Sequence, residues 1–421
     1  MDIEQLTLPA GWQIKAIEDV YTFTKKPKGL RLEGYTEVPF IPMELVPLGR
    51  IFAEDWNLKR TADLSSGTYF ENGDLLVAKI TPSFENGKQA IAKIDRPFGY
   101  ATTEVIPIQE IEGTSDKFYL HFVLFHPEIR KELAAKMDGS TGRQRLRKEI
   151  LASKKIPLPP LDEQRRIAHV LSTVQTAIEQ QARFIALTSE LKSALMHKLF
   201  TEGLRGEKQK QTEIGLVPES WDVVELGSLA KIGNGSTPKR DNKGYWDGGS
   251  IPWLTSGKIH ERFIEQADEF VTDMAVKECH LPSVKANSLL IAITGQGKTL
   301  GNSAIVKFET CISQHLAYVQ FHTEEIVPEF LLWFLQTRYH HLRSVGQAGG
   351  STKGALTCGY IKTYPVPVPA KDEQREIASI FVVLDEKERN HARKKEELEE
   401  LFRTLLHQLM TAQIRVNELD L

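Results

Sequence analysis

Two long stretches of the chain place apolar residues three and four positions apart, which is the spacing of an amphipathic helix. The first stretch starts at Asp162 and runs to Gly203 without Gly or Pro, and the second starts at Asp372. A helix of about 40 residues would be about 60 Å long. Because each stretch carries one apolar stripe, we expect two long helices that pack against each other along a coiled-coil-like seam. The seam positions are Ile167, Leu171, Val174, Ile178, Ile185, Leu195 and Leu199 in the first stretch, and Ile377, Phe381, Leu384, Leu398, Phe402, Leu405 and Leu409 in the second.

The start of each predicted helix is marked by a change of composition. The extended, proline-rich runs IPLPP and PVPVPA precede Leu161 and Lys371 and are incompatible with a helix interior. Asp162 and Asp372 are N-cap candidates, and acids follow in the first turn. The second helix differs from the first in its middle, where seam positions are polar; these are Glu388, His391 and Lys395.

The segments before the two helices have a different pattern, in which short β-rich runs are separated by clusters of Gly, Asn, Asp and Pro. The runs are DLLVAKI, QAIAKI and EVIPIQ in the first segment and SLLIAIT, SAIVKF and LAYVQF in the second. Each segment ends in a helical stretch, KFYLHFVLF or PEFLLWFLQTRYHHL. The pattern predicts an α+β domain of roughly 160 residues in each segment.

The chain repeats itself at an offset of 210 residues. DEQRRIA at 162–168 recurs as DEQREIA at 372–378, and LKSALMHKLF recurs as LFRTLLHQLM in the same register. Upstream, LPAGW matches VPESW and GDLLVA matches NSLLIA, with offsets that drift as loop lengths change. We therefore predict a tandem duplication, with variable blocks at 1–160 and 207–370 and conserved helices at 161–206 and 371–421.

Composition restricts the class of protein without identifying it. The 421 residues are 41% hydrophobic and 26% charged, which is typical of a soluble globular protein. The net charge is −3, so any basic surface for nucleic acid must be local. Cys279, Cys311 and Cys358 show no CxxC spacing, which favours a reducing cytosol over a disulfide framework or a cysteine zinc site. No signal peptide or bilayer-spanning run of about 20 apolar residues is visible, so we expect a cytoplasmic protein without membrane contact.

Two motifs look like nucleotide chemistry but lack its structural context. AITGQGKT at 292–299 fits a relaxed P-loop pattern, yet a strand-like sequence follows it instead of the helix that a P-loop must open. We interpret it as a β-hairpin loop. IFVVLDE at 380–386 lies inside the second predicted helix. The chain contains no N/D-P-P-Y/F tetrapeptide for adenine methylation, no HExxH and no His/Cys set at ligand spacing, so no catalytic or metal constellation is indicated.

Loops rich in Gly, hydroxyl and basic residues recur at equivalent places in the two halves. These groups bind phosphates and base edges, although any one such loop is equally compatible with an ordinary solvated turn. The pairing of the loops across the duplication favours DNA binding. The candidate residues are Lys25, Lys26, Lys28, Arg31, Ser140, Thr141, Arg143, Arg145 and Arg147 in the first half, and Ser236, Thr237, Lys239, Arg240, Ser256, Lys258, Lys298, Ser351, Thr352 and Lys353 in the second.

The whole chain resembles the specificity subunit of type I restriction-modification systems. The resemblance rests on PLPPLDEQRRIA, repeated as PVPAKDEQREIA, and on VPESW and GSTPKR with the following YW and IPWLTSG. It implies two target-recognition domains, each reading one part of a split double-stranded DNA site, and two antiparallel conserved helices. It also implies methyltransferase (M) subunits, two in number by the family pattern, and restriction (R) subunits in the full complex.

The resemblance further implies that this chain is not itself an enzyme and holds no cofactor. S-adenosylmethionine, ATP and Mg²⁺ are then expected on the partner subunits. Residues expected in helix pairing and M-subunit docking are Ile167, Leu171, Leu195, Leu199, Ile377, Phe381, Leu405 and Leu409. Because the two variable blocks differ in sequence, we expect an asymmetric target.

Two other classes compete with this interpretation. A stand-alone DNA-modifying enzyme would need a cofactor-binding strand–GxG–helix unit, which the sequence lacks. A non-DNA adaptor or scaffold would need only the paired helices, and the two variable domains would then have no use.

Overall fold

The computed structural model describes residues 8–140, 142–295, 298–348 and 355–416. The chain forms two compact units. Unit 1 comprises Met1–Ile185 and Asn390–Leu421, and unit 2 comprises Ala186–Arg389. Each unit therefore contains one recognition domain and a half of each long helix.

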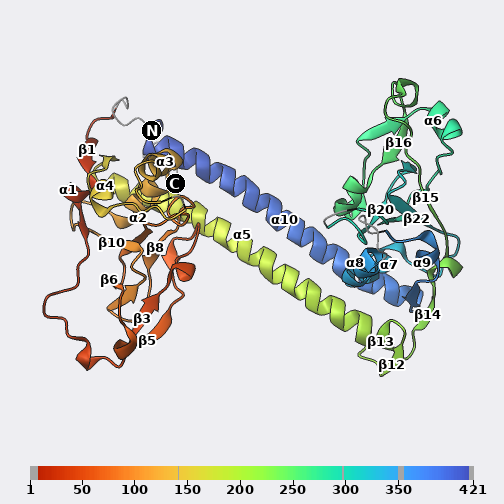
Figure 1. The fold of residues 1–421 in the computed structure, drawn as a ribbon, viewed down its shortest axis with the longest axis horizontal. Helices are drawn as coiled ribbons and strands as arrows, with labels where there is room; N and C mark the ends of the chain where they lie inside the picture. The colour runs from red at the N-terminus through yellow and green to blue at the C-terminus, as the bar shows by residue number, and fades with distance from the viewer. Residues whose placement is uncertain (1–7, 141, 296–297, 349–354, 417–421) are drawn as a thin grey trace. The chain divides into compact units, whose positions relative to one another are not determined.

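Unit 1 begins with a mixed recognition domain, whose elements follow the predicted order of strands and then helices (Figure 1). Its strands are β1 (Gln13–Ala16), β2 (Tyr21–Phe23), β3 (Glu37–Ile41), β4 (Phe52–Ala53), β5 (Asn57–Arg60), β6 (Thr68–Glu71), β7 (Leu75–Ala78), β8 (Gln89–Ala92), β9 (Phe98–Ala101), β10 (Val105–Glu110) and β11 (Lys155–Leu158). Its helices are α1 (Ile17–Val20), η2 (Leu32–Gly34), η3 (Met43–Leu45), η4 (Thr61–Asp63), α2 (Lys117–Phe125), α3 (Pro127–Ala134) and α4 (Lys148–Ala152).

The recognition domain of unit 2 has the same plan. Its strands are β12 (Gln209–Thr212), β13 (Gly215–Pro218), β14 (Asp222–Glu225), β15 (Ala230–Asn234), β16 (Ile251–Leu254), β17 (Phe263–Ile264), β18 (Glu269–Val271), β19 (Leu289–Ala292), β20 (Ser303–Val306), β21 (Cys311–Ile312), β22 (Leu316–Phe321) and β23 (Pro365–Val368). Its helices are η5 (Leu226–Ser228), η6 (Lys243–Tyr245), η7 (Ser256–Glu261), α6 (Asp273–Glu278), α7 (Pro328–Thr337), α8 (Tyr339–Ala348) and α9 (Cys358–Lys362).

Sheet topology confirms the duplication. The central sheet has the order β2-β10-β7-β8-β4 in unit 1 and β15-β22-β19-β20-β17 in unit 2. In both sheets the last pair, β4 with β8 and β17 with β20, is parallel, and the other pairs are antiparallel. A second sheet contains a parallel pair in each unit, β3 with β9 and β16 with β21. The proline-rich run before each long helix is β11 or β23, paired with β1 or β14.

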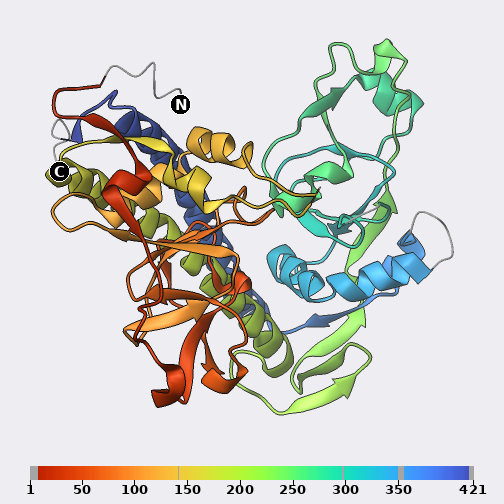
Figure 2. The ribbon, with the colours of Figure 1, turned by 60° about the vertical axis from the view of Figure 1, so that its left-hand side comes forward.

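The two long helices are α5 (Leu161–Glu202) and α10 (Lys371–Met410). In unit 1 the first part of α5 packs against the last part of α10, and in unit 2 the last part of α5 packs against the first part of α10. The helices are therefore antiparallel, and within each unit their segments lie side by side in both views (Figures 1 and 2). Gly203 ends α5 with a positive φ of 67°, the left-handed backbone that favours glycine.

One local prediction was wrong. Asp162 and Asp372 do not cap the helices, because α5 and α10 begin one residue earlier and include both acids in their first turns. The stretch 328–342 is helical as predicted, but it is divided between two helices: α7 ends at Thr337 and α8 starts at Tyr339. Arg338 lies between them as the C-cap residue of α7. Among the described residues, no helix is both long and apolar enough to cross a membrane.

Candidate nucleic-acid interface

In unit 2 the loop that follows β15 is held in a fixed shape. A Cβ on Gly235 would lie 1.8 Å from the carbonyl oxygen of Ile312, so only glycine lets the loop pass β21. The indole Nε1 of Trp253 donates to the carbonyl oxygen of Ser236 at 3.2 Å. Trp246 likewise donates to the carbonyl oxygen of Lys239 at 3.0 Å. The backbone from 235 to 240 is therefore positioned by buried or partly buried neighbours.

Arg240 is part of this framework. Its guanidinium lies 4.0 Å from the ring centre of Trp246 and 5.1 Å from that of Trp253, and it forms an ion pair with Glu269 at 2.6 Å. The adjacent Lys239 side chain is exposed and makes no ion pair with any residue that the structure describes. Arg240 thus shapes the loop, whereas Lys239 presents a charge to solvent.

The turn at Gln314 and His315 contacts this loop, and the loop at Thr294 contacts that turn. These polar residues were not among those predicted from the sequence. Thr237 donates its hydroxyl to the amide oxygen of Gln314. On the other side, the hydroxyl of Thr294 lies beside Nδ1 of His315, and the amide of Ile293 donates to the carbonyl oxygen of His315 at 3.0 Å. Gln314 and His315 form the turn before β22. The sequence SQH offered a signal of its own there, because glutamine is a base-reading side chain and stands between two strands.

In unit 1 the loop that precedes α4 carries several charged residues. Asp138 and Arg145 exchange both backbone hydrogen bonds, at 3.1 and 2.8 Å, and so close the loop 139–144 with Arg143 exposed within it. Arg145 makes a bidentate pair with Glu104 at 2.9 to 3.2 Å, and this bond holds the pKa of the Glu104 carboxyl below its usual range. Arg147 pairs with Asp138 at 2.9 Å.

Two isolated β-bridges, one in each unit, occupy equivalent places in the repeat. Arg145 forms a β-bridge with Ile80 after β7, and Ala355 forms one with Thr294 after β19. Arg145 and Ala355 differ by 210, and Ile80 and Thr294 differ by 214, which is the drifted offset of GDLLVA and NSLLIA, so the two bridges are equivalent in the repeat. Thr141, Ser351, Thr352 and Lys353, which were predicted to bind DNA, lie outside the described residues.

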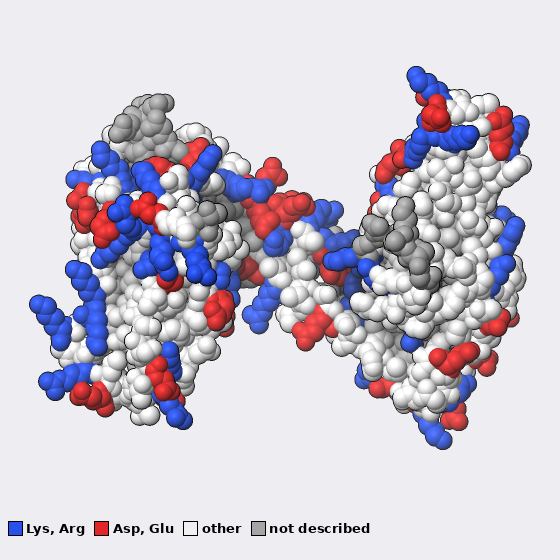
Figure 3. Space-filling view, viewed as in Figure 1, with Lys and Arg blue, Asp and Glu red and all other residues white. Residues whose placement is uncertain are grey.

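The predicted basic residues therefore divide into two groups. Arg145, Arg147, Arg240 and Lys258 are held in ion pairs within their own units. A second group is exposed and forms no ion pair among the residues placed in the structure; it consists of Lys25, Lys26, Lys28, Arg31, Arg143, Lys239 and Lys298. Figure 3 shows Lys and Arg side chains projecting from the recognition domains, with acidic side chains between them. Ser140 is exposed, and Ser236, Thr237 and Ser256 are partly buried.

The predicted hairpin at 292–299 is confirmed, because β19 and β20 pair as an antiparallel hairpin around it. Lys298 lies in this loop, and its carbonyl oxygen accepts a bond of 2.8 Å from the Tyr339 hydroxyl. The run 380–386 is part of α10, as predicted. No group of three or more His, Cys, Asp or Glu in the described ranges could hold a metal ion.

The repeated Asp-Glu-Gln sequence anchors each helix to its recognition domain. The carboxylate of Glu163 accepts from the Trp12 indole at 3.1 Å and from Arg415 at 2.7 Å. In the second copy, Glu373 accepts from the Trp221 indole at 3.2 Å. The match of LPAGW with VPESW is thereby explained, since each tryptophan meets the glutamate of its own unit.

Gln164 and Gln374 are fully buried, and each makes three buried or partly buried hydrogen bonds. Gln164 donates to the carbonyl oxygens of Pro159 and Thr114 and accepts from the amide of Asp116. Gln374 donates to the carbonyl oxygens of Pro369 and Glu325 and accepts from the amide of Val327. The most specific motif of the sequence is therefore structural, and it does not contact the loops described above.

The predicted seam residues pack inside the two units. Ile167, Leu171 and Leu409 belong to the core of unit 1, and Leu199, Ile377 and Phe381 to that of unit 2. Leu405 and Leu195 are partly buried against the same cores. Two helix leucines related by the repeat are instead half-exposed: Leu191 at 50% and Leu401 at 46%.

Comparisons with known proteins agree with this geometry. The family "Type I restriction modification DNA specificity domain" matches residues 9–186 and 218–400. The MjaVIII specificity subunit of a type I restriction enzyme from Methanocaldococcus jannaschii is 24% identical over 443 aligned residues, covering 100% of this chain and 96% of the relative. The EcoAI specificity subunit from Escherichia coli is 29% identical over 216 residues, which cover 51% of this chain and 36% of that protein.

A solved structure shares the fold over nearly the full length. The S subunit of a type I restriction-modification system from M. genitalium superimposes with a TM-score of 0.61 at 18% identity, covering 97% of both chains. The resemblance inferred from the repeated helix start is thus confirmed. The chain belongs to the family of type I restriction-modification DNA specificity proteins and carries its specificity domain twice.

Proposed function

We propose that this chain is the DNA-reading subunit of a type I restriction-modification complex, and that each recognition domain reads one half of a split double-stranded site. The observation that carries the proposal is that one sheet topology occurs twice with different side chains at equivalent loop positions. In unit 1 Arg145, which is bridged to Ile80, pairs with Glu104, whereas unit 2 has Ala355 bridged to Thr294, whose hydroxyl lies beside His315. Side chains that differ in charge and hydrogen bonding favour different bases, so the two half-sites differ.

The uninterrupted helices α5 and α10 support a spacer of constant length between the half-sites. Methylome sequencing of cells with and without the gene tests the function. We expect one bipartite motif to lose its methylation when the gene is removed, with different sequences on the two sides of a spacer of fixed length. An unchanged methylome contradicts DNA reading, and identical half-sites contradict the asymmetric assignment.

Catalysis belongs to the partner subunits in this proposal. Methyl transfer would be carried out by M subunits that hold S-adenosylmethionine, and ATP and Mg²⁺ would be used by R subunits. The family relationship supports this division of labour, together with the absence from the sequence of an N/D-P-P-Y/F tetrapeptide. Chemistry on an adenine within a duplex requires extrusion of the base from the stack, which the M subunits would perform on DNA positioned by this chain.

Lys239 should contribute to DNA binding through charge, whereas Lys258 should not. Lys258 is only 15% exposed and already neutralised by Glu261 and Asp268 at 2.8 and 2.9 Å. Lys239 is free to replace a counterion on a phosphate. In the assembled complex with M subunits, we expect Lys239→Ala to weaken binding about 5–10-fold at moderate salt and to lower the slope of log K against log salt by about 1.

The matched control is Lys258→Ala, which should leave that slope unchanged. Binding isotherms at four or more salt concentrations, recorded by fluorescence anisotropy on a genomic site, provide the measurement. Equal slopes for wild type and Lys239→Ala would show that this loop does not contact phosphate.

The M subunits would dock on the exposed leucines of the two helices. Leu191 and Leu401 are half-exposed apolar side chains at positions related by 401 − 191 = 210, so each of two M subunits would meet the same leucine on a different helix. The buried seam residues support this surface from beneath by holding the helices together.

We expect the double variant Leu191→Asp, Leu401→Asp to remain folded but to bind M subunits about tenfold more weakly or worse, because it places charge in an apolar contact. The control is Val383→Asp, since Val383 is equally exposed but has Thr173 as its repeat equivalent. Co-purification with tagged M and thermal melting of the isolated chain distinguish the two effects. If the double variant bound M subunits as well as the wild type does, Leu191 and Leu401 would not belong to the docking surface.

A further inference from the structure

A layer of charged side chains lies between the two helices in the core of unit 2. Lys192 of α5 donates to the carboxylate of Asp385 at 3.1 Å and to that of Glu388, both on α10. The side chains of Lys192 and Asp385 are only 9% and 1% exposed. Arg262 from the recognition domain pairs with the same carboxylate, and both cations lie within 6 Å of the Trp333 ring centre. Charges so deeply buried are tolerated only while they remain paired.

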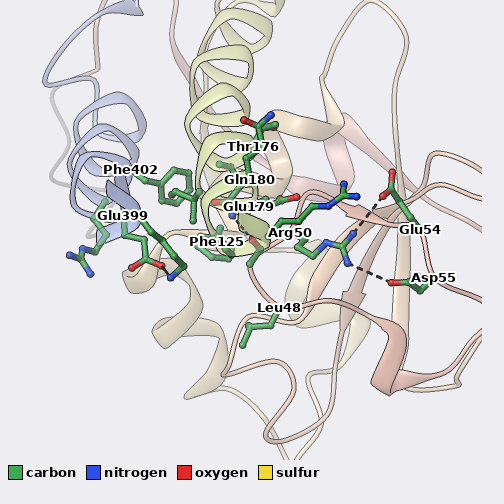
Figure 4. A pocket seen from close by; sticks show the side chains of 17 residues that line it. Leu48, Arg50, Glu54, Asp55, Phe125, Thr176, Glu179, Gln180, Glu399 and Phe402 are labelled. Atoms are coloured by element: carbon green, nitrogen blue, oxygen red, sulfur yellow. Dashed lines mark hydrogen bonds and ion pairs between the residues drawn. The ribbon is translucent and has the colours of Figure 1, made fainter. Parts of the chain in front are cut away.

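Unit 1 has no such layer at the equivalent positions. The repeat offset relates Lys192 to Phe402 (192 + 210) and Asp385 to Gln175 (385 − 210). Phe402 and Gln175 both line a pocket of about 1010 Å³ between the helices and the loop at 48–55 (Figure 4). Gln175 donates to the carbonyl oxygen of Gly49. One helix pairing thus uses an ion pair and the other an aromatic ring and an amide.

This difference decides what happens when a helix pairs with a copy of itself. Two α5 helices in the same geometry would bury Lys192 against Gln175 and Ile178, the equivalents of Asp385 and Glu388, without a carboxylate. Two α10 helices would bury Asp385 and Glu388 against Phe402 and lose the lysine. Removing one partner from a buried charge pair is strongly unfavourable. Asp385 would keep Arg262 and Arg389, which belong to its own half-chain. Lys192 and Glu388, by contrast, find an oppositely charged partner only when α5 pairs with α10.

A second contact between α5 and α10 also uses two different residues. Nδ1 of His391 and Oε1 of Gln181 are 2.8 Å apart, and the Phe184 ring stacks on the imidazole at 5.0 Å. Because 391 − 181 = 210, the histidine and the glutamine occupy the same position of the repeat. Self-pairing would place two amides or two imidazoles opposite each other in place of this complementary pair.

We propose that the Lys192, Asp385 and Glu388 layer is a pairing-selectivity device, which makes the half-chain containing α5 accept the half-chain containing α10 and reject a second copy of itself. Single buried polar groups select partners in coiled coils by the same penalty on wrong pairings. The device keeps two different recognition domains on one helix pair. It operates whether or not the chain binds DNA.

The test uses the full chain, with a protease recognition sequence inserted after Arg205 in the exposed turn that follows α5. The protein is folded, cut, unfolded in urea and refolded, and native mass spectrometry counts pairs of like and unlike halves. We expect unlike pairs of the wild-type halves to exceed like pairs by about tenfold or more. A statistical mixture would overturn the proposal.

The decisive variant gives unit 2 the residues that unit 1 already has: Lys192→Phe, Asp385→Gln and Glu388→Ile. We expect its excess of unlike pairs to fall about fivefold or more, toward the statistical ratio. The control Lys198→Met removes an exposed lysine from the same helix and should preserve the wild-type ratio. An unchanged ratio in the triple variant would overturn the proposal.

A second measurement avoids refolding. Cut chains of light and heavy isotope composition are mixed in native buffer, and the appearance of like pairs is followed over time. Like pairs should form from the triple variant and not from the wild type. Their absence from the variant, or their formation at equal rates from both proteins, contradicts the selectivity device.

Discussion

Replacing Phe381 by alanine should lower the free energy of unfolding by about 3–5 kcal/mol, the cost of removing a buried aromatic ring and leaving a cavity. Phe381 is fully buried in unit 2, with its ring stacked on Phe200 of α5 at 5.9 Å and tilted against Trp333 of α7 at 5.6 Å. This one side chain therefore joins both long helices and the recognition domain. Loss of the Phe381 ring should therefore weaken the packing of both long helices and of the recognition domain.

Val383→Ala is the control for this change. Val383 lies two residues further along α10 but is 50% exposed, so its truncation should alter the free energy of unfolding by no more than about 0.5 kcal/mol. Urea unfolding followed by circular dichroism and by tryptophan fluorescence provides the measurement. Similar losses for the two variants would show that the helix pair does not depend on this contact.

Local sequence patterns were sufficient to predict most of the secondary structure. Apolar runs such as LLVA at 75–78 and LLIA at 289–292 are buried strands, and the two heptad-like stretches are α5 and α10. The division of the molecule was not accessible in the same way. The boundary between the two compact units lies within α5 and within α10. Packing against the recognition domains, rather than chain order, decides to which core each helix segment belongs.

The sequence was sufficient to identify a loop of the candidate interface, but not to decide which residues of that loop are available to bind DNA. Composition identified the loop around 236–240, yet Arg240 and Lys239 look alike in sequence and differ in the structure. What separates them is Glu269, 29 positions away from Arg240, which pairs with one and not with the other. Ion pairing between distant segments depends on tertiary packing, so it cannot be predicted from the sequence near either residue.

Gln164→Ala should cost about 2–4 kcal/mol of the free energy of unfolding. Gln164 is fully buried, and its removal leaves the amide of Asp116 and the carbonyl oxygens of Pro159 and Thr114 without this partner. Each buried polar group left unsatisfied costs about 1–3 kcal/mol, and the sum is reduced where water enters the vacated space. The effect arises from hydrogen bonding, since little apolar surface is lost.

The equivalent glutamine of the second copy repeats the test, and an exposed glutamine on α5 serves as the control. Gln374→Ala removes the same three bonds in unit 2, so its loss of stability should match that of Gln164→Ala within about 1 kcal/mol. Gln180→Ala changes an exposed glutamine on the same helix and should be close to neutral. Chemical denaturation of the three variants measures all of these values. If Gln164→Ala and Gln374→Ala were as mild as Gln180→Ala, the repeated Asp-Glu-Gln sequence would need an explanation outside folding, and contact with a partner subunit would be the first to examine.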